Sequence, residues 1–180
     1  THWHDDHTNG NHAYRETFPD ANIVAHTATL RSLREEWQPM EDGRKEAYAE
    51  ADAGQLLATA ETFDDPARKY AYRVYAAYVA ALKPELPTMQ LVYPDTVFAG
   101  KLNFNSAGRR IVVEWLGRGN TDGDVVVWLP DDDVLITGDI LVAPIPFAFD
   151  SPITDWAATL ERVIATGAGI PNSSCWKALR

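Results

Sequence analysis

The sequence predicts an α+β domain, because its local pattern changes from helical to β-type near Pro87. Before that residue, apolar side chains recur at the spacing of three and four that is typical of amphipathic helices. After it, short runs rich in Val, Ile and Leu alternate with turn residues, and one more helical stretch follows them. The predicted organisation is a helical segment, residues 29–83, set between two β regions.

The first half of the chain contains one predicted strand and three predicted helices. Residues 23–25 form a short apolar run that predicts a buried strand. A helix is expected over residues 29–37, with Pro39 ending it, and a second over about 41–62, which is rich in Ala, Glu, Leu and Lys. The third is expected over residues 66–83, because two aspartates before Pro66 are typical of a helix start.

The second half predicts an antiparallel meander followed by a last helix. Its strands are expected at residues 102–104, 111–116, 125–129 and 134–137. Turn residues at 106–108 and 130–133 separate neighbouring runs too briefly for a crossover helix, so the strands should be antiparallel. The last helix is expected over residues 152–166, with Ser151 as its cap and Gly167 as its stop.

The composition indicates a folded protein and argues against two classes of binding partner. The chain has 180 residues, of which 46% are hydrophobic, so it can bury a core and is not disordered. Its 16 basic and 26 acidic residues give a net charge of −10. Nucleic acids and anionic membrane surfaces attract basic proteins, so neither is expected as a partner.

Three features of the sequence bear on location and metal chemistry. The longest apolar run, residues 76–82, is far shorter than a membrane span, which predicts a soluble chain. No signal peptide is visible at the start, and one would lie upstream, so the compartment is left open. Cys175 is the single cysteine, so any metal site must use His, Asp or Glu.

All five histidines lie within the first 26 residues: His2, His4, His7, His12 and His26. On an extended segment His2 and His4 point the same way, and a turn after them would bring Asp6 and His7 to the same place. Imidazole nitrogen with carboxylate oxygen suits zinc, or less specifically iron or manganese, as one ion or two. The segment therefore predicts a metal site.

An expression tag or a solvated polar end is the alternative interpretation of such a cluster. Tags are plain runs of histidine, whereas Trp3 and two aspartates interrupt this one. The interruption favours metal binding.

The four residues His2, His4, Asp6 and His7 match the signature H-x-H-x-D-H, and here the chain resembles the metallo-β-lactamase-fold hydrolase superfamily. Residues 117–139 follow the second half of the family pattern in order and spacing. The resemblance covers residues 1–171 and implies a four-layer αββα sandwich, incomplete at the N-terminus, with the helical segment as an insert. Residues 172–180 are an atypical tail.

The resemblance also implies roles for individual residues. Asp139 would bridge two metals, and Asp6 would be both a ligand and the catalytic group that orients the nucleophile or moves a proton. Most family members have a third histidine where this chain has Asn120, which offers only a weak carbonyl ligand. Ser173 stands where the last histidine ligand is expected.

Three further polar residues are interpreted as structural. Asp124 lies in a glycine-rich loop before a β run, which favours a hydrogen bond that stabilises the loop. His12 and His26 are expected to make hydrogen bonds in loops or behind the metal ligands, and not to bind the metal themselves.

These residues together predict a metal-dependent hydrolase that acts on a small-molecule substrate. In this hypothesis a metal-bound hydroxide attacks a carbonyl or related electrophile, and the substrate class stays open. A catalytically impaired metal-binding domain is the first alternative, because Asn120 and Ser173 occupy two expected ligand positions. A di-iron redox protein of the same fold is the second.

Overall fold

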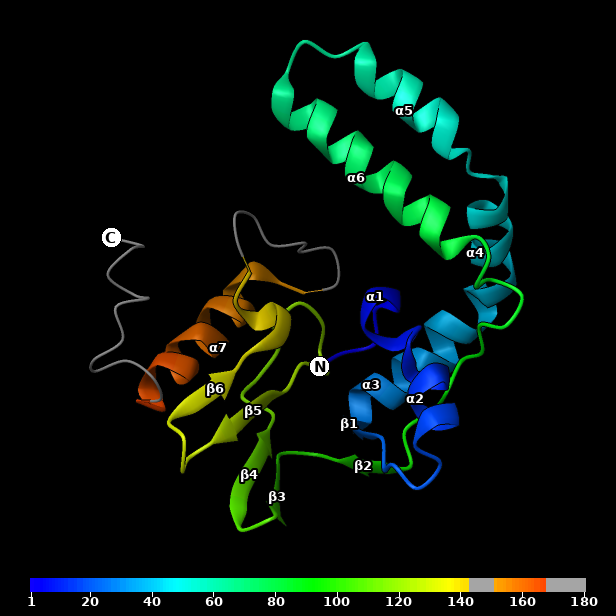
Figure 1. Cartoon of the computed structure of the whole chain (residues 1–180). Coiled ribbons are helices and arrows are strands. Elements are labelled where there is room, and N and C mark those ends of the chain that lie inside the picture. The colour runs from blue at the N-terminus through cyan, green and yellow to red at the C-terminus, as the bar shows by residue number, and fades with distance from the viewer. Residues whose placement is uncertain (143–150, 168–180) are drawn as a thin grey trace. The chain divides into compact units, whose positions relative to one another are not determined.

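The computed structural model describes residues 1–142 and 151–167, apart from the side chains of residues 39–42 and 44. These residues form two compact units. The first contains residues 1–35 and the described residues from 92 onward, and the second contains Glu36–Leu91. Figure 1 shows the elements of each unit.

A four-stranded antiparallel meander forms the larger sheet of the first unit (Figure 1). Its strands, in spatial as well as chain order, are β3 (Lys101–Ser106), β4 (Arg109–Glu114), β5 (Val126–Leu129) and β6 (Val134–Ile136). All three pairings are antiparallel, which confirms the predicted meander. The β3–β4 turn places Ala107 and Gly108 at positive φ, the conformation that tight hairpin turns require.

The smaller sheet pairs β1 (Val24–His26) in parallel with β2 (Thr96–Phe98), so that Val24 lies opposite Thr96. β1 corresponds to the strand predicted at residues 23–25, one residue further along. β2 was not predicted. Its three residues are too few to show a period, and a parallel partner from a distant part of the chain leaves no local signal.

Short helices fill the N-terminal part of the first unit: α1 (Asp5–Thr8), α2 (Asn11–Thr17) and α3 (Thr27–Ser32). His26 caps α3, because its ring Nδ1 accepts the Ala28 N–H at 3.2 Å. The prediction that Pro39 ends this helix is wrong. A π-helical turn (Leu33–Trp37) leads from α3 into α4 (Gln38–Glu50), so the chain stays helical through Pro39, which lies in the first turn of α4.

Helix α7 (Ile153–Ala165) belongs to the same core as the meander. Val126, Ile140 and Val163 form a buried cluster. The Trp156 indole donates to the Ile140 carbonyl at 2.9 Å, and this hydrogen bond ties the helix to the loop after β6.

The start of α7 differs from the prediction, and its end agrees. Ser151 does not cap the helix, because the N-cap is Pro152 and no side chain accepts a hydrogen bond there. Ile153, rather than Pro152, is therefore the first helical residue. Gly167 has a φ of +69°, so the predicted glycine stop is confirmed.

The second unit consists of α4, α5 (Ala53–Glu61) and α6 (Pro66–Leu82). The predicted helix over 41–62 is broken, because the Asp52 side chain accepts the N–H groups of Gly54 and Gln55 and so starts a new helix. The predicted start of α6 is confirmed, with the Asp65 carboxylate accepting the Ala67 N–H.

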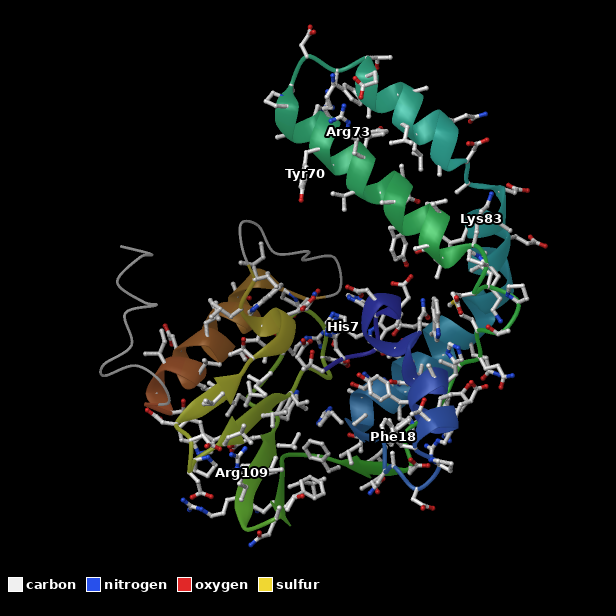
Figure 2. All side chains as sticks on the ribbon, viewed as in Figure 1. His7, Phe18, Tyr70, Arg73, Lys83 and Arg109 are labelled. Carbon is white, nitrogen blue, oxygen red and sulfur yellow. The ribbon has the colours of Figure 1, made fainter. Side chains whose placement is uncertain are left out.

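Helices α5 and α6 pack as a hairpin (Figure 1). Ala60, Ala76 and Val79 are fully buried in it. Near the connecting turn, Glu61 accepts hydrogen bonds from Lys69 and Arg73. Tyr70 projects away from α5 and is 71% exposed (Figure 2). None of the described helices is long and apolar enough to cross a membrane.

Candidate metal centre

The first eight residues fold into a segment that gathers three histidines. His2 and His4 precede α1, and His7 lies within it. The His4 carbonyl accepts the N–H groups of His7 and Thr8, each at 3.1 Å, which closes the helical turn. This turn brings the His7 ring beside the His2 ring, with 4.3 Å between their centroids.

His2 and His4 also face each other directly. The Nε2 atom of His2 is 2.8 Å from the Nδ1 atom of His4. The His2 ring is buried, whereas His4 is only half-buried. Two imidazole nitrogens that converge in this way can share a hydrogen bond or bind one cation between them.

Asp139 joins this group from the far end of the meander. It lies in a 3₁₀ turn (Gly138–Ile140) that follows β6. Its Oδ2 atom is 3.3 Å from Nε2 of His7. One ligand atom from each of His2, His7 and Asp139 lies within 4.8 Å of the others, so the three can hold a metal ion.

Gly138 is required for this approach of the two chain segments. It has a φ of +52°, and a Cβ atom at this position would lie 2.3 Å from the Thr1 hydroxyl. Any side chain would therefore push the 3₁₀ turn away from the histidines.

Asn120 lies beside Asp139, in the loop between β4 and β5. Its side chain is buried, and its Nδ2 atom donates to Asp139 Oδ2 at 3.2 Å. Its carbonyl Oδ1 is buried with no hydrogen-bond partner among the described residues. An unpaired buried acceptor at this place fits a residue that ligates a metal.

Asp6 is the predicted ligand that lies furthest toward solvent. Its side chain is 66% exposed, and its Oδ2 atom is 3.5 Å from Nε2 of His7. The structure thus groups His2, His7 and Asp139 tightly, with His4, Asp6 and Asn120 next to one or another of them. Ser173 and the rest of the 172–180 tail lie outside the described residues.

The electrostatics of His2 favour the form that binds metals. Burial is the main cause that lowers the pKa of His2 to about 2, and the neighbouring His7 and His4 act in the same direction. His2 is therefore a neutral imidazole at physiological pH. A neutral ring keeps one nitrogen lone pair available for a metal ion.

Asp124 lies behind His2 and was predicted only to stabilise its loop. That role is confirmed, because its Oδ2 atom accepts the Thr121 N–H at 2.6 Å and the Thr121 hydroxyl at 2.8 Å. Its other oxygen, Oδ1, is 3.3 Å from Nδ1 of His2. The pKa of this carboxyl is raised by burial, while the two hydrogen bonds from Thr121 act in the opposite direction.

The contact between Asp124 and His2 was not predicted from the sequence, because a glycine-rich loop has no periodicity that relates its side chains to another segment.

His12 and His26 each make a hydrogen bond within their own part of the chain, as predicted. His12 Nδ1 lies 2.8 Å from the Asn9 carbonyl, and the His26 ring caps α3 and stacks on Trp115.

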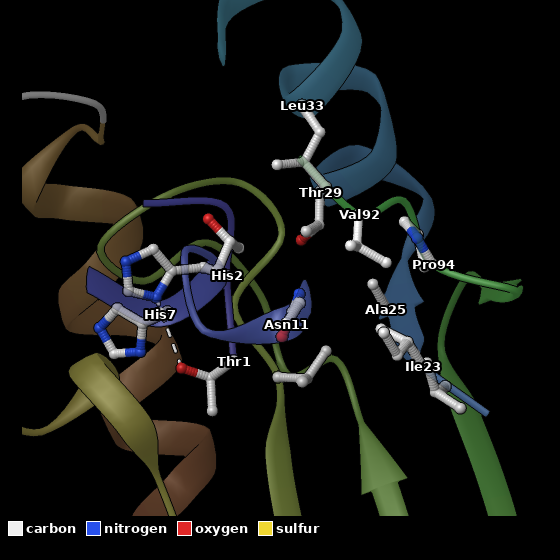
Figure 3. A pocket seen from close by; sticks show the side chains of 13 residues that line it. Thr1, His2, His7, Asn11, Ile23, Ala25, Thr29, Leu33, Val92 and Pro94 are labelled. Atoms are coloured by element: carbon white, nitrogen blue, oxygen red, sulfur yellow. Dashed lines mark hydrogen bonds between the residues drawn. The ribbon is translucent and has the colours of Figure 1, made fainter. Parts of the chain in front are cut away.

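A cavity of about 120 Å³ lies against the two neighbouring imidazoles (Figure 3). His2, His7 and Thr1 line its polar side. Its other walls are mainly apolar and include Leu33 and Val92. Two of the histidines therefore border an apolar hollow within the first unit.

The sequence profile of the metallo-beta-lactamase superfamily matches residues 1–170. The chain belongs to this superfamily. Membership supports a metal-dependent hydrolase fold, because proteins of the metallo-beta-lactamase superfamily typically bind metal ions and are generally hydrolytic. No curated protein sequence matches the chain.

Solved structures of the superfamily share its fold. A metallo-beta-lactamase from Pontibacter korlensis is 18% identical with a TM-score of 0.56, and the match covers 92% of this chain and 54% of that one. The metallo-beta-lactamase IND-7 is 17% identical with a TM-score of 0.55, covering 94% and 55%. The chain thus spans about half the length of these structures, which confirms the predicted α+β metallo-beta-lactamase sandwich in incomplete form.

Proposed function

We propose that this chain carries the metal centre of a hydrolase that acts on a small-molecule substrate. The observation that carries the proposal is the grouping of His2, His7 and Asp139, whose ligand atoms lie within 4.8 Å of one another. A bound divalent ion would polarise the scissile bond and make a coordinated water acidic enough to attack it near neutral pH.

The donor atoms fit such an ion. Imidazole nitrogens with one carboxylate oxygen match zinc first, and iron or manganese less specifically. His4 adds a nitrogen 2.8 Å from that of His2, and Asn120 adds a buried carbonyl oxygen that has no other partner among the described residues. In this proposal Asn120 is the weakest ligand, because a neutral amide oxygen binds zinc less well than an imidazole does.

Asp6 would accept and release the proton of the attacking water. Its carboxylate is beside His7 but largely exposed, so it borders both the donors and solvent. Asp6 Oδ2 would accept a proton from the attacking water and later release it to the leaving group or to solvent.

Metal content and hydrolysis together test the proposal. Protein loaded with Zn²⁺ and freed of excess should retain one or two ions per chain and should hydrolyse a member of a panel of esters, lactones, thioesters and lactams. His7→Ala should lose metal, whereas His12→Ala, which removes an imidazole that contacts Asn9, should not. A wild-type protein that retains no metal would contradict the proposal.

One observation favours a second candidate, a metal-binding domain with impaired catalysis. The Asn120 amide donates to Asp139 and so occupies an oxygen that a metal ion would use. Under this alternative the loaded protein hydrolyses nothing, and Asn120→His together with Ser173→His restores hydrolysis. The di-iron alternative predicts a visible absorption band after aerobic expression, which a zinc-only protein would lack.

A further inference from the structure

We infer that Asp124 is a positioning residue, which takes the His2 ring proton on Nδ1 and thereby leaves the Nε2 lone pair free for the metal centre. This inference rests on the proposed function, since the metal centre gives the free lone pair its use. Asp124 would support the ligand His2 without touching the metal ion itself.

The contacts on the two edges of the His2 ring carry the inference. On one edge Nδ1 is 3.3 Å from Asp124 Oδ1, and on the other Nε2 is 2.8 Å from His4 Nδ1. A neutral imidazole has one ring proton, and a carboxylate is the stronger acceptor, so the proton belongs on the edge that faces Asp124. Nε2 then carries the lone pair.

Burial makes this arrangement hard to replace. The side chains of His2 and Asp124 are both 0% exposed, so solvent cannot take over the role of the carboxylate. The Thr1 hydroxyl is 3.4 Å from the same ring nitrogen. A hydroxyl can turn to donate or to accept, so it does not determine which ring nitrogen is protonated, whereas a carboxylate only accepts.

The loop that contains Asp124 fixes its carboxylate. Thr121 donates both its N–H and its hydroxyl to Oδ2. The same hydroxyl accepts the Gly123 N–H at 3.1 Å, so its only proton is directed at Asp124. Because Oδ2 is held by two donors, Oδ1 is left to face His2. Oδ1 is buried and has no hydrogen-bond partner among the described residues, so a proton on the nearby Nδ1 of His2, 3.3 Å away, is the donor that would satisfy it.

Gly119 allows the loop to close around this carboxylate. A Cβ atom there would lie 3.2 Å from both Cβ and Cγ of Asp124 and 2.8 Å from Ile140. The loop thus holds Asp124 behind His2 and, one residue after Gly119, places Asn120 beside Asp139. This one loop would therefore supply Asn120 as a weak ligand and Asp124 as the residue that positions the stronger ligand His2.

The substitution Asp124→Asn separates positioning from packing, because it keeps the shape of the side chain. The fixed Thr121 N–H requires the amide oxygen, so the amide NH₂ group must face His2. Nδ1 then has to accept a hydrogen bond, and the ring proton moves to Nε2, where it blocks metal binding.

Two readouts test D124N. In competition with a chelator, its Zn²⁺ affinity should fall about 10- to 100-fold, the range found when a carboxylate behind a ligating histidine is removed. Nitrogen-15 NMR of the zinc-free protein should show the His2 proton on Nδ1 in the wild type and on Nε2 in D124N. Asp20→Asn removes the same charge from an exposed turn and should change neither.

The outcomes distinguish this inference from the proposed function. A wild-type protein that does not bind Zn²⁺ refutes the proposed function, while the NMR measurement still decides which nitrogen is protonated. A D124N protein that keeps the Nδ1 proton and wild-type affinity overturns the inference.

A second pair of variants covers the case in which D124N fails to fold. Thr121→Val removes one of the two donors to the carboxylate and should weaken Zn²⁺ binding several-fold, whereas Thr121→Ser keeps the hydroxyl and should bind as the wild type does. Equal affinity of T121V and T121S would also overturn the inference.

Discussion

The carboxylate of Asp139 lies 3.3 Å from Nε2 of His7, although the two residues are far apart in the sequence. His7 is in α1, whereas Asp139 follows β6, the last strand of the meander. The pair therefore links the two segments that contribute most of the candidate ligands. A change at either residue should affect the same candidate metal site.

Asp139→Asn should reduce metal binding. The variant keeps the size of the side chain but removes the one negative charge in the group with His2 and His7. We expect its Zn²⁺ affinity to fall at least about ten-fold, because ligating oxygens of this kind are deprotonated carboxylates. Elemental analysis and chelator competition measure the effect. If D139N retains as much zinc as the wild type at the same free zinc concentration, Asp139 is not a ligand.

Asn120→His should have the opposite effect on zinc binding. An imidazole at this buried position would offer a better zinc ligand than the amide carbonyl does. The larger side chain should also cost about 1–3 kcal/mol of folding stability in the absence of metal, because the site is already packed. Zinc titrations and urea unfolding of the zinc-free protein test the two parts separately. A lower zinc affinity in N120H would argue against Asn120 facing the ion.

Local sequence signals were sufficient for the elements that depend on neighbouring residues. The meander was predicted because its strands are joined by short turns, and the start of α6 because Asp65 and Pro66 determine a helix end locally. The break at Asp52 was missed, although its capping side chain is also a local signal. The residues on both sides of Asp52 favour helix, so the stretch was interpreted as one continuous helix.

Elements determined by distant contacts were not predictable in this way. α1 has four residues and β2 has three, so neither shows a period. The same holds for the site. The spacing of His2, His4 and His7 marks one segment as a metal candidate, but nothing in the spacing shows that Asp124 lies against His2, because this contact depends on how a loop closes in three dimensions.

Gly123→Ala should destabilise the first unit. A Cβ atom at this position would lie 2.7 Å from the backbone nitrogen of Thr29 and 2.3 Å from its hydroxyl. Backbone at that distance cannot move without displacing α3, so we expect a loss of about 1–3 kcal/mol in the free energy of unfolding. Urea denaturation followed by circular dichroism measures it.

Gly10→Ala is the matched control for that variant. The Cβ atom that alanine adds there would have no heavy atom within 4 Å, and φ is negative at −79°, so alanine fits without strain. This variant should be neutral or more stable by up to about 1 kcal/mol, because alanine restricts the unfolded chain. Equal stability of G123A and G10A would show that the α3 contact is looser than the structure has it.

His26 should make stability depend on pH in mildly acidic solution. Burial lowers its pKa below the ordinary value of 6.5, and nearby Arg31 acts in the same direction, while Asp122 opposes them. Between the lowered pKa and about 6.5 the unfolded chain binds more protons than the folded one does. This contribution to stability is therefore complete above about pH 6.5 and is lost as the pH falls, by at most about 1.4 kcal/mol per pH unit.

His26→Asn isolates this contribution. Protonation of His26 would destroy the lone pair that accepts the Ala28 N–H, whereas asparagine accepts the same hydrogen bond and does not titrate. Asparagine loses the stacking on Trp115, so H26N should be less stable than the wild type near neutral pH. That difference should shrink as the pH falls from about 7.5 to about 5, because only the wild type is destabilised by protonation at residue 26. Urea unfolding of both proteins across this range measures it, and a difference that stays constant would show that His26 keeps its ordinary pKa in the folded protein.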